Sequence, residues 1–265
     1  LLIFNTSLGF VGSAKGYPGG HTSRLVAYSG YLWELPIRSK FVTLYYLQTL
    51  SYYTWYYLGI EVNDVTVASD LIIFLVNSSK SQIAVLTPLW KERVNSVLGM
   101  SSVRTFSYDT YGGIAITNGS GYLYILCGGS GKWWVSKISL HDGQLTGYVS
   151  IPAVISNPQD YIGEYYHQAS LVFGSGYLYF TFGASNTKMQ IAKIDISTME
   201  VVKELTYSQF NKNFGQPAYY EGLIYMPYSN CPVEIVVASG ISLGLVKDVT
   251  INTRACYGKY ILPFS

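Results

Sequence analysis

The chain has 265 residues, of which 49% are hydrophobic and only 12% are charged, and its formal net charge is +2. This composition excludes a disordered polypeptide, and the length suits one large folded domain or two small ones. No Lys/Arg cluster marks a nucleic-acid surface, and the longest aliphatic run, 71–76, is too short to cross a bilayer, so we expect neither a nucleic-acid partner nor a membrane span.

A four-residue step recurs along the chain: a Gly, any residue, an apolar residue, and then an aromatic or apolar one. Successive steps lie 36 to 55 residues apart, a period typical of propeller blades rather than of helical solenoids. The steps are SGYLW at Gly30, SDLII at Asp70 with Asp in place of Gly, SGYLY at Gly121, SGYLY at Gly176, EGLIY at Gly222 and YGKYI at Gly258.

Each step lies between two apolar runs, as in SLVF and FTF on either side of Gly176. Because Gly adopts the positive φ that a tight hairpin needs, the step predicts the turn between two antiparallel strands. A polar turn, a third apolar run, a short turn and a fourth run then follow. Four antiparallel strands per repeat are typical of a propeller blade.

The two ends of the chain complement each other. The first twelve residues, LLIFNTSLGFVG, resemble a third strand, a turn and a fourth strand, whereas 253–265 contain only the first two strands of a repeat. One sheet built from both ends removes the unpaired sheet edges. We therefore predict an all-β fold, a six-bladed β-propeller of four-stranded antiparallel blades closed by N- and C-terminal strands that share one blade. Residues 1–265 form a single domain, which can equally be a segment of a longer polypeptide.

One segment also suits a helix. In TPLWKERVNSVL, residues 87–98, Thr87 is a good N-cap, Pro88 suits the first helical position, and the apolar spacing is helical. We expect a strand, a turn and a strand here because the segment occupies that position in the repeat.

The stretch GYLYFTFGASNTKMQIAKIDISTMEVV, residues 176–202, resembles the blades of quinoprotein-like and Kelch-like propellers. In those blades a Gly-x-Leu-Tyr hairpin precedes an Ile-Asp-x-x-Thr-Gly-x-Val turn, and here 194–202 and, more loosely, 138–143 match that second motif. The resemblance implies the fold along nearly the whole chain. It implies no activity, because propellers include enzymes, lectins and scaffolds.

Two long connections, 99–112 and 151–168, are rich in Tyr and are expected on the face that usually binds ligands. In the second connection, binding of a protein or glycan partner and packing of the rings on one another are equally open. In the Tyr-rich stretch 45–57, strand alternation predicts that half of the rings pack between blades. The candidate ligand-binding residues are Tyr108, Asp109, Tyr111, Tyr161, Tyr165, Tyr166 and His167.

Polar residues also occur near the starts of the expected inner strands, where they converge on the mouth of the central channel. Such groups can bind a ligand or an ion. Alternatively, they satisfy one another around a water-filled axis. The candidate channel-mouth residues are His21, Arg24, Asp64, Gln216 and Arg254.

No sequence motif identifies an enzyme, a cofactor or a metal site. The chain lacks a Gly-x-Ser-x-Gly elbow, an HExxH motif and a phosphate-binding loop, and its three His residues are widely spaced. Its three Cys residues suit small buried positions, with a bridge between Cys231 and Cys256 as the alternative. We therefore expect no cofactor and no metal.

Three Asn-x-Ser sequons, at Asn5, Asn77 and Asn118, are candidate glycosylation sites in turn-like contexts. The Tyr-, Ser- and Gly-rich, Lys-poor composition resembles that of archaeal surface and virion proteins. We expect an extracellular, non-catalytic binding, attachment or structural module of a cell-surface or virion-surface assembly, which can form homo-oligomers or filaments. The alternatives are a hydrolase or oxidoreductase with its site at the channel mouth, formed from His21, Asp64, Asp109, His167 and Arg254, and an intracellular Kelch-like scaffold.

Overall fold

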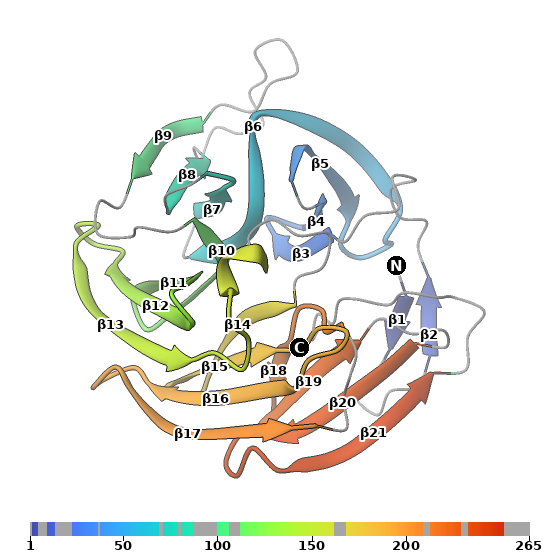
Figure 1. The fold of residues 1–265 in the computed structure, drawn as a ribbon. Helices are drawn as coiled ribbons and strands as arrows, with labels where there is room; N and C mark the ends of the chain where they lie inside the picture. The colour runs from blue at the N-terminus through green and yellow to red at the C-terminus, as the bar shows by residue number, and fades with distance from the viewer. Residues whose placement is uncertain are drawn as a thin grey trace.

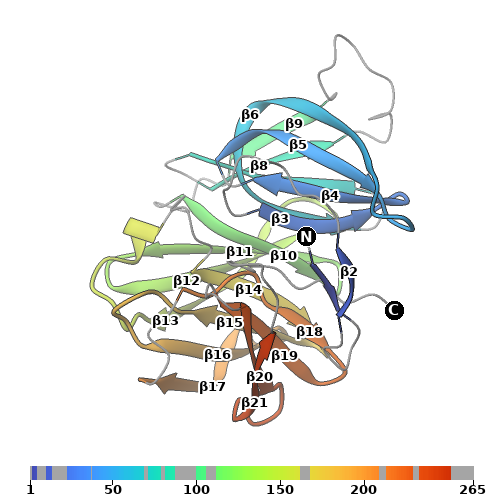
Figure 2. The ribbon, with the colours of Figure 1, turned by 90° about the vertical axis from the view of Figure 1, so that its right-hand side faces the viewer.

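The computed structural model describes residues 2–4, 10–13, 23–36, 38–68, 71–78, 81–86, 100–105, 112–161, 168–208, 213–228 and 233–251. The described strands form antiparallel sheets arranged in a ring around a central axis (Figures 1 and 2). This arrangement is a β-propeller, so the predicted all-β propeller fold is confirmed.

The strands group into five sheets, each ordered as the chain runs. A two-stranded sheet comprises β1 (Leu2–Phe4) and β2 (Phe10–Ser13). A seven-stranded sheet comprises β3 (Ser23–Tyr28), β4 (Tyr31–Pro36), β5 (Ser39–Tyr46), β6 (Tyr52–Ala68), β7 (Leu71–Val76), β8 (Gln82–Leu86) and β9 (Met100–Thr105). Three four-stranded sheets comprise β10 (Gly113–Gly119), β11 (Tyr122–Gly129), β12 (Lys132–Ser139) and β13 (Leu145–Pro152); β14 (Ala169–Gly174), β15 (Tyr177–Phe182), β16 (Met189–Asp195) and β17 (Glu200–Tyr207); and β18 (Ala218–Tyr220), β19 (Leu223–Tyr228), β20 (Val233–Ser239) and β21 (Leu245–Ile251).

Strand β6 joins the two halves of the seven-stranded sheet. Its first half pairs with β5 through Tyr57 and, after an irregularity, again at Val62, and its second half pairs with β7 from Val62 on. Between them Gly59 has a φ of +77°, a conformation that L side chains rarely adopt. One strand of 17 residues therefore runs from the rim of the ring to its centre (Figure 1).

The hairpin turns predicted from the Gly step are present in four repeats. In each, the Gly has a φ near +80°, and the residue before it also has a positive φ. Two successive residues with positive φ make a type I′ turn, whose twist matches that of the flanking strands. The turns are Ser29–Gly30, Ser120–Gly121, Ser175–Gly176 and Glu221–Gly222, whereas Asp70 and Gly258 lie outside the described residues.

The turns between the third and fourth strands also repeat. In four of them the N–H of the fifth residue donates to the first carbonyl at 2.7 to 2.9 Å, and that fifth residue has a positive φ. Two of them, at 138–143 and 194–202, are the turns predicted from the Ile-Asp-x-x-Thr-Gly-x-Val motif. The fifth residues are Leu50, Gly143, Met199 and Leu243, and the side chains of Met199 and Leu243 are buried.

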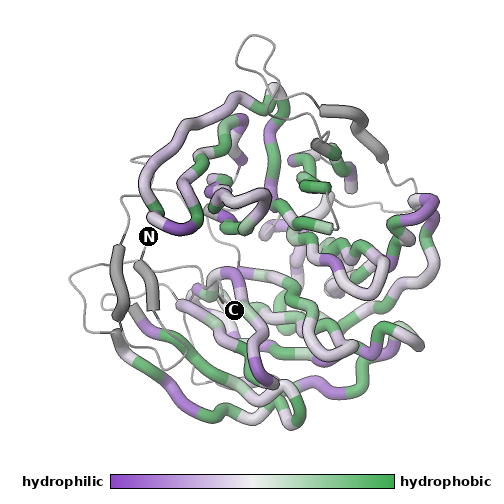
Figure 3. Tube along the Cα trace, turned by 180° about the vertical axis from the view of Figure 1, so that it is seen from behind, coloured by the Kyte–Doolittle hydropathy of each residue, from purple (hydrophilic) through white to green (hydrophobic). Residues whose placement is uncertain are grey.

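Most of the core lies between successive sheets. One cluster joins the sheet β10–β13 to β14–β17: the Trp133 ring, fully buried, lies 5.4 Å from Phe180 and 5.0 Å from Phe182 between ring centroids. Three further clusters join the other neighbouring sheets or half-sheets in the same way. Figure 3 shows the hydrophobic segments concentrated in the inner and middle strands, with hydrophilic segments along the outer strands and turns.

Three further local predictions have different outcomes. Residues 99–112 were expected to be a loop, but Met100–Thr105 form strand β9, which pairs with β8. The fourth strand of this repeat thus lies beyond 87–98, which are outside the described residues. The predicted pairing of the N-terminal strands is confirmed by β1 and β2, whereas their C-terminal partners, 252–265, are also outside the described residues.

Candidate functional site

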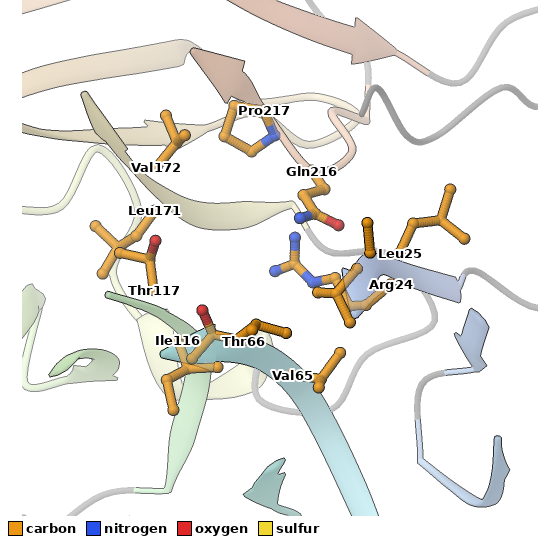
Figure 4. A pocket seen from close by; sticks show the side chains of 13 residues that line it. Arg24, Leu25, Val65, Thr66, Ile116, Thr117, Leu171, Val172, Gln216 and Pro217 are labelled. Carbon is orange, nitrogen blue, oxygen red and sulfur yellow. The ribbon is translucent and has the colours of Figure 1, made fainter. Parts of the chain in front are cut away.

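A cavity of about 280 Å³ lies at the centre of the ring, where the inner strands of several sheets meet (Figure 4). Its walls come from β3, β6, β10 and β14 and from the two residues before β18. Most of the lining is aliphatic, and Arg24, Thr66, Thr117 and Gln216 supply the polar side chains. Two predicted channel-mouth residues, Arg24 and Gln216, therefore line the cavity.

Arg24 and Asp64 form a buried ion pair beside this cavity. Arg24 Nε lies 2.9 Å from Asp64 Oδ1, and the two residues are only 1% and 2% exposed. Asp64 Oδ1 also accepts the Val65 N–H at 2.8 Å, and Oδ2 accepts the Ile116 N–H at 2.7 Å. The carboxylate thereby connects β3, β6 and β10.

Burial dominates the protonation of Asp64. Loss of contact with water raises the pKa of this carboxyl to about 6, against the opposing effects of the Arg24 charge and of the two backbone N–H donors. Desolvation of a buried ion pair often exceeds its Coulombic gain. We therefore expect the ion pair to fix how β3, β6 and β10 are arranged, and to add little to the free energy of unfolding.

Gln216 faces the cavity from the side opposite β6 (Figure 4). Its Oε1 atom is buried and accepts no hydrogen bond from any described residue. Nearby, the Thr66 hydroxyl donates to Asn118 Oδ1 at 2.6 Å. A buried acceptor of this kind is usually satisfied by an ordered water or another polar group.

Tyr161 packs against another aromatic ring, which is one of the two environments expected for it. It ends the short 3₁₀ helix η1 (Pro158–Tyr161), is half-buried, and its ring lies 5.3 Å from that of Phe182 at nearly a right angle. The remaining loop and channel-mouth candidates, Tyr108, Asp109, Tyr111, Tyr165, Tyr166, His167, His21 and Arg254, lie outside the described residues.

Two of the three sequon asparagines are described. Asn77 directly follows β7, as a turn-like context predicts, and its Nδ2 donates to Glu61 Oε1 at 2.6 Å. Asn118 differs from the expectation, because it belongs to strand β10, opposite Leu123, rather than to the turn that follows. Asn5 lies outside the described residues, and glycosylation stays a prediction for all three.

Strand alternation predicted that half of the seven aromatic residues in 45–57 are buried, but only Tyr45 and Tyr56 are, at 3% and 2% exposed. Tyr46, Tyr53 and Trp55 form an exposed group with Phe41 on β5 and β6, with side chains between 36% and 50% exposed. Neighbouring rings lie about 5 Å apart, such as Tyr46 and Tyr53. We call these four residues the aromatic surface. Tyr52 is also exposed, but its ring lies 6.3 Å from that of Tyr45 and is not part of this group.

Within the described part of the chain, His, Cys, Asp and Glu side chains form no group of three or more that could hold a metal ion. The same residues include no helix long and apolar enough to cross a membrane. Cys127 is buried as expected, with its sulfur 3.0 Å from the Ser81 hydroxyl oxygen.

Comparison with known proteins supports the fold. No family model and no curated protein matches the chain. It is similar in structure to Kuenenia stuttgartiensis hydrazine synthase, with a TM-score of 0.61, 12% identity and coverage of 91% of this chain and 72% of that one. A chain of the mitotic checkpoint complex gives a TM-score of 0.55 at 12% identity, covering 96% and 72%. The computationally designed Ika8 protein gives 0.52 at 10% identity, covering 92% of this chain, which spans 65% of the designed one. At these identities the likeness concerns the propeller fold alone.

Proposed function

We propose that this chain is an extracellular, non-catalytic propeller that serves as a binding, attachment or structural module of a cell-surface or virion-surface assembly. The observation that carries the proposal is the aromatic surface on β5 and β6. Tyr and Trp combine a rigid apolar ring with a polar tip, and they are enriched where proteins contact partners or glycans. No charged residue occurs between Tyr52 and Ile60, along the outer half of β6.

The state of Asp64 favours binding over catalysis. A general acid or base must reach a substrate proton, and Asp64 is instead held by Arg24 and two backbone N–H groups. Its carboxylate also does not line the cavity. The pair therefore supports the alternative expected from the sequence, in which polar channel groups satisfy one another.

Attachment is tested with a combined Tyr46→Ser, Tyr53→Ser and Trp55→Ser variant. Fluorescently labelled protein is applied to cells of the source organism and to a glycan array. We expect at least tenfold weaker binding with little change in Tm, because these side chains are exposed. The matched control is Val202→Ser, Ile241→Ser and Val246→Ser, which removes exposed apolar side chains elsewhere, at 52%, 82% and 55% exposed. Equal loss in both variants, or none in the first, would contradict the role of the aromatic surface.

Extracellular location is tested separately. Mass spectrometry of the protein from its native source should show sugars at Asn5, Asn77 or Asn118. A bare chain with the mass of the printed sequence would argue against export.

We also propose that the ring has six blades, closed by β1, β2 and residues 252–265. Two apolar clusters support closure: each contains buried side chains from one described sheet only, unlike the clusters that join neighbouring sheets. Leu32 and Tyr45 belong to one, and Ile235 and Val237 to the other. The β1–β2 sheet lies between these two parts of the ring (Figures 1 and 2).

Closure is tested by ending the chain at Ile251. We expect a large fall in Tm and increased binding of an apolar dye, both reversed by adding a synthetic peptide of residues 252–265. An unchanged Tm without the peptide would show that these residues do not complete a blade.

A further inference from the structure

We propose that the outer end of β6, residues 52–55, pairs edge to edge with the same strand of a second copy of this chain. The inference rests on the proposed function and deepens it, because it names one partner within the surface assembly. It is based on a sheet edge that is open and carries no charged side chain. We call residues 52–55 the β6 edge.

The β6 edge is paired on one side only. Its residues pair with β5, whereas pairing of β6 with β7 begins at Val62, beyond the bend at Gly59. Among the described strands, none pairs with the other side of the β6 edge. In an antiparallel strand, alternate residues direct their N–H and C=O groups to each side. Unpaired backbone groups therefore lie along the rim of the ring, where Figure 1 shows the start of β6.

The β6 edge lacks the side chains that normally prevent edge pairing. Residues 41–60 include no Asp, Glu, Lys, Arg or His. The fourth strands of the other repeats each contain a charge or a Pro: Arg104 in β9, Pro152 in β13, Lys203 in β17 and Lys247 in β21. Charged side chains and Pro at a sheet edge oppose pairing with another chain. Among these outer strands, the β6 edge is thus the one suited to pairing.

The absence of charge favours a second copy as the partner. Pairing of two identical strands about a two-fold axis brings each side chain close to its own counterpart, so a charge at the edge would meet a like charge. A different protein would be selected by opposite charges, which the β6 edge does not offer. Tyr52 and Trp55 are 58% and 50% exposed, and aromatic side chains on paired strands attract each other.

The test places charges on the edge and keeps every aromatic side chain. Sedimentation velocity of the full chain over a concentration series should show a monomer–dimer equilibrium. Thr54→Lys and Thr54→Glu should each weaken dimerisation at least tenfold, because like charges then face each other. An equal mixture of the two variants should dimerise again. Antiparallel pairing through one edge puts residue 54 of both copies on the same face, because only residues whose backbone groups point to the same side lie opposite each other.

The control is Thr206→Lys, an exposed Thr on the outer strand β17, which should leave dimerisation unchanged. A wild-type chain that stays monomeric up to its solubility limit would overturn the inference. So would equal weakening by Thr206→Lys, or a mixture of the Thr54 variants that stays monomeric. A monomeric wild type that still binds cells would overturn this inference alone, whereas a dimer that binds no cells would overturn only the attachment role.

Discussion

The buried ion pair of Arg24 and Asp64 allows a test of which effect controls the pKa of Asp64. The two candidates are desolvation of the carboxyl and its attraction to the Arg24 charge. The perturbation is Asp64→Asn, which removes the titrating group at nearly constant volume. The pKa of Asp64 is about 6 in the fold against an ordinary 3.8, so the folded protein binds this proton more tightly than the unfolded chain does. For such a carboxyl, stability is greatest below about pH 4 and falls as the pH rises to 6.

The magnitude follows from the same shift. A difference of about two pKa units corresponds to about 3 kcal/mol of unfolding free energy. The Asn variant lacks this dependence, but it places an NH₂ group where one of the two accepting oxygens faces a backbone N–H. An unsatisfied buried donor costs about 1–3 kcal/mol at every pH. We therefore expect the variant to be clearly less stable than the wild type at pH 4 and close to it at pH 7.

The assay is urea denaturation of both proteins from pH 4 to pH 7. The informative quantity is the difference in unfolding free energy between wild type and variant at each pH, because Asp142 and Asp195 titrate in both proteins and their contributions cancel. Hydrogen bonds from Ser139 and Ser197, respectively, lower the pKa of these two carboxyls, so they act in the opposite direction. A difference that grows as the pH rises would refute the reasoning, because it would mean that attraction to Arg24 outweighs burial.

Three further predictions concern stability. Trp133→Ala should cost about 3–5 kcal/mol in urea denaturation, because it empties a fully buried position between two sheets; a loss under 1 kcal/mol would show that the sheets repack. Gly176→Ala should lower the unfolding free energy by about 1–2 kcal/mol, because the φ of Gly176 is +79°. The added Cβ would meet no atom within 4 Å, so the loss comes from the backbone alone. The control Ser175→Gly, at the neighbouring residue, should change the unfolding free energy little. Met199→Gly relieves the strain of a positive φ, about 1–2 kcal/mol, but loses packing worth about 2–5 kcal/mol, so it should lower Tm. A raised Tm would show that the strain is the larger effect.

The sequence was sufficient to predict the features that depend on a few neighbouring residues. A hairpin turn needs two residues with positive φ, so the Ser-Gly pairs at Gly30, Gly121 and Gly176 identify the first and second strands of each repeat. Apolar runs on either side then give antiparallel strands, and their period gives the propeller. Prediction was least accurate in 87–112, where the fourth strand is β9 at Met100–Thr105 and not within 87–98 as expected.

The tertiary structure decided the features that depend on residues far apart in the chain. The sequence placed Arg24, Asp64 and Gln216 near the axis. Only the folded ring brings Arg24 into contact with Asp64, and only strand β10 supplies the Ile116 N–H that donates to the Asp64 carboxylate. Strand alternation indicates that half of a Tyr-rich stretch is buried, yet whether Tyr161 is exposed depends on Phe182 across the sheet interface. Local φ preferences are properties of one or two residues and can be read along the chain, whereas burial and charge pairing depend on how separate sheets pack together.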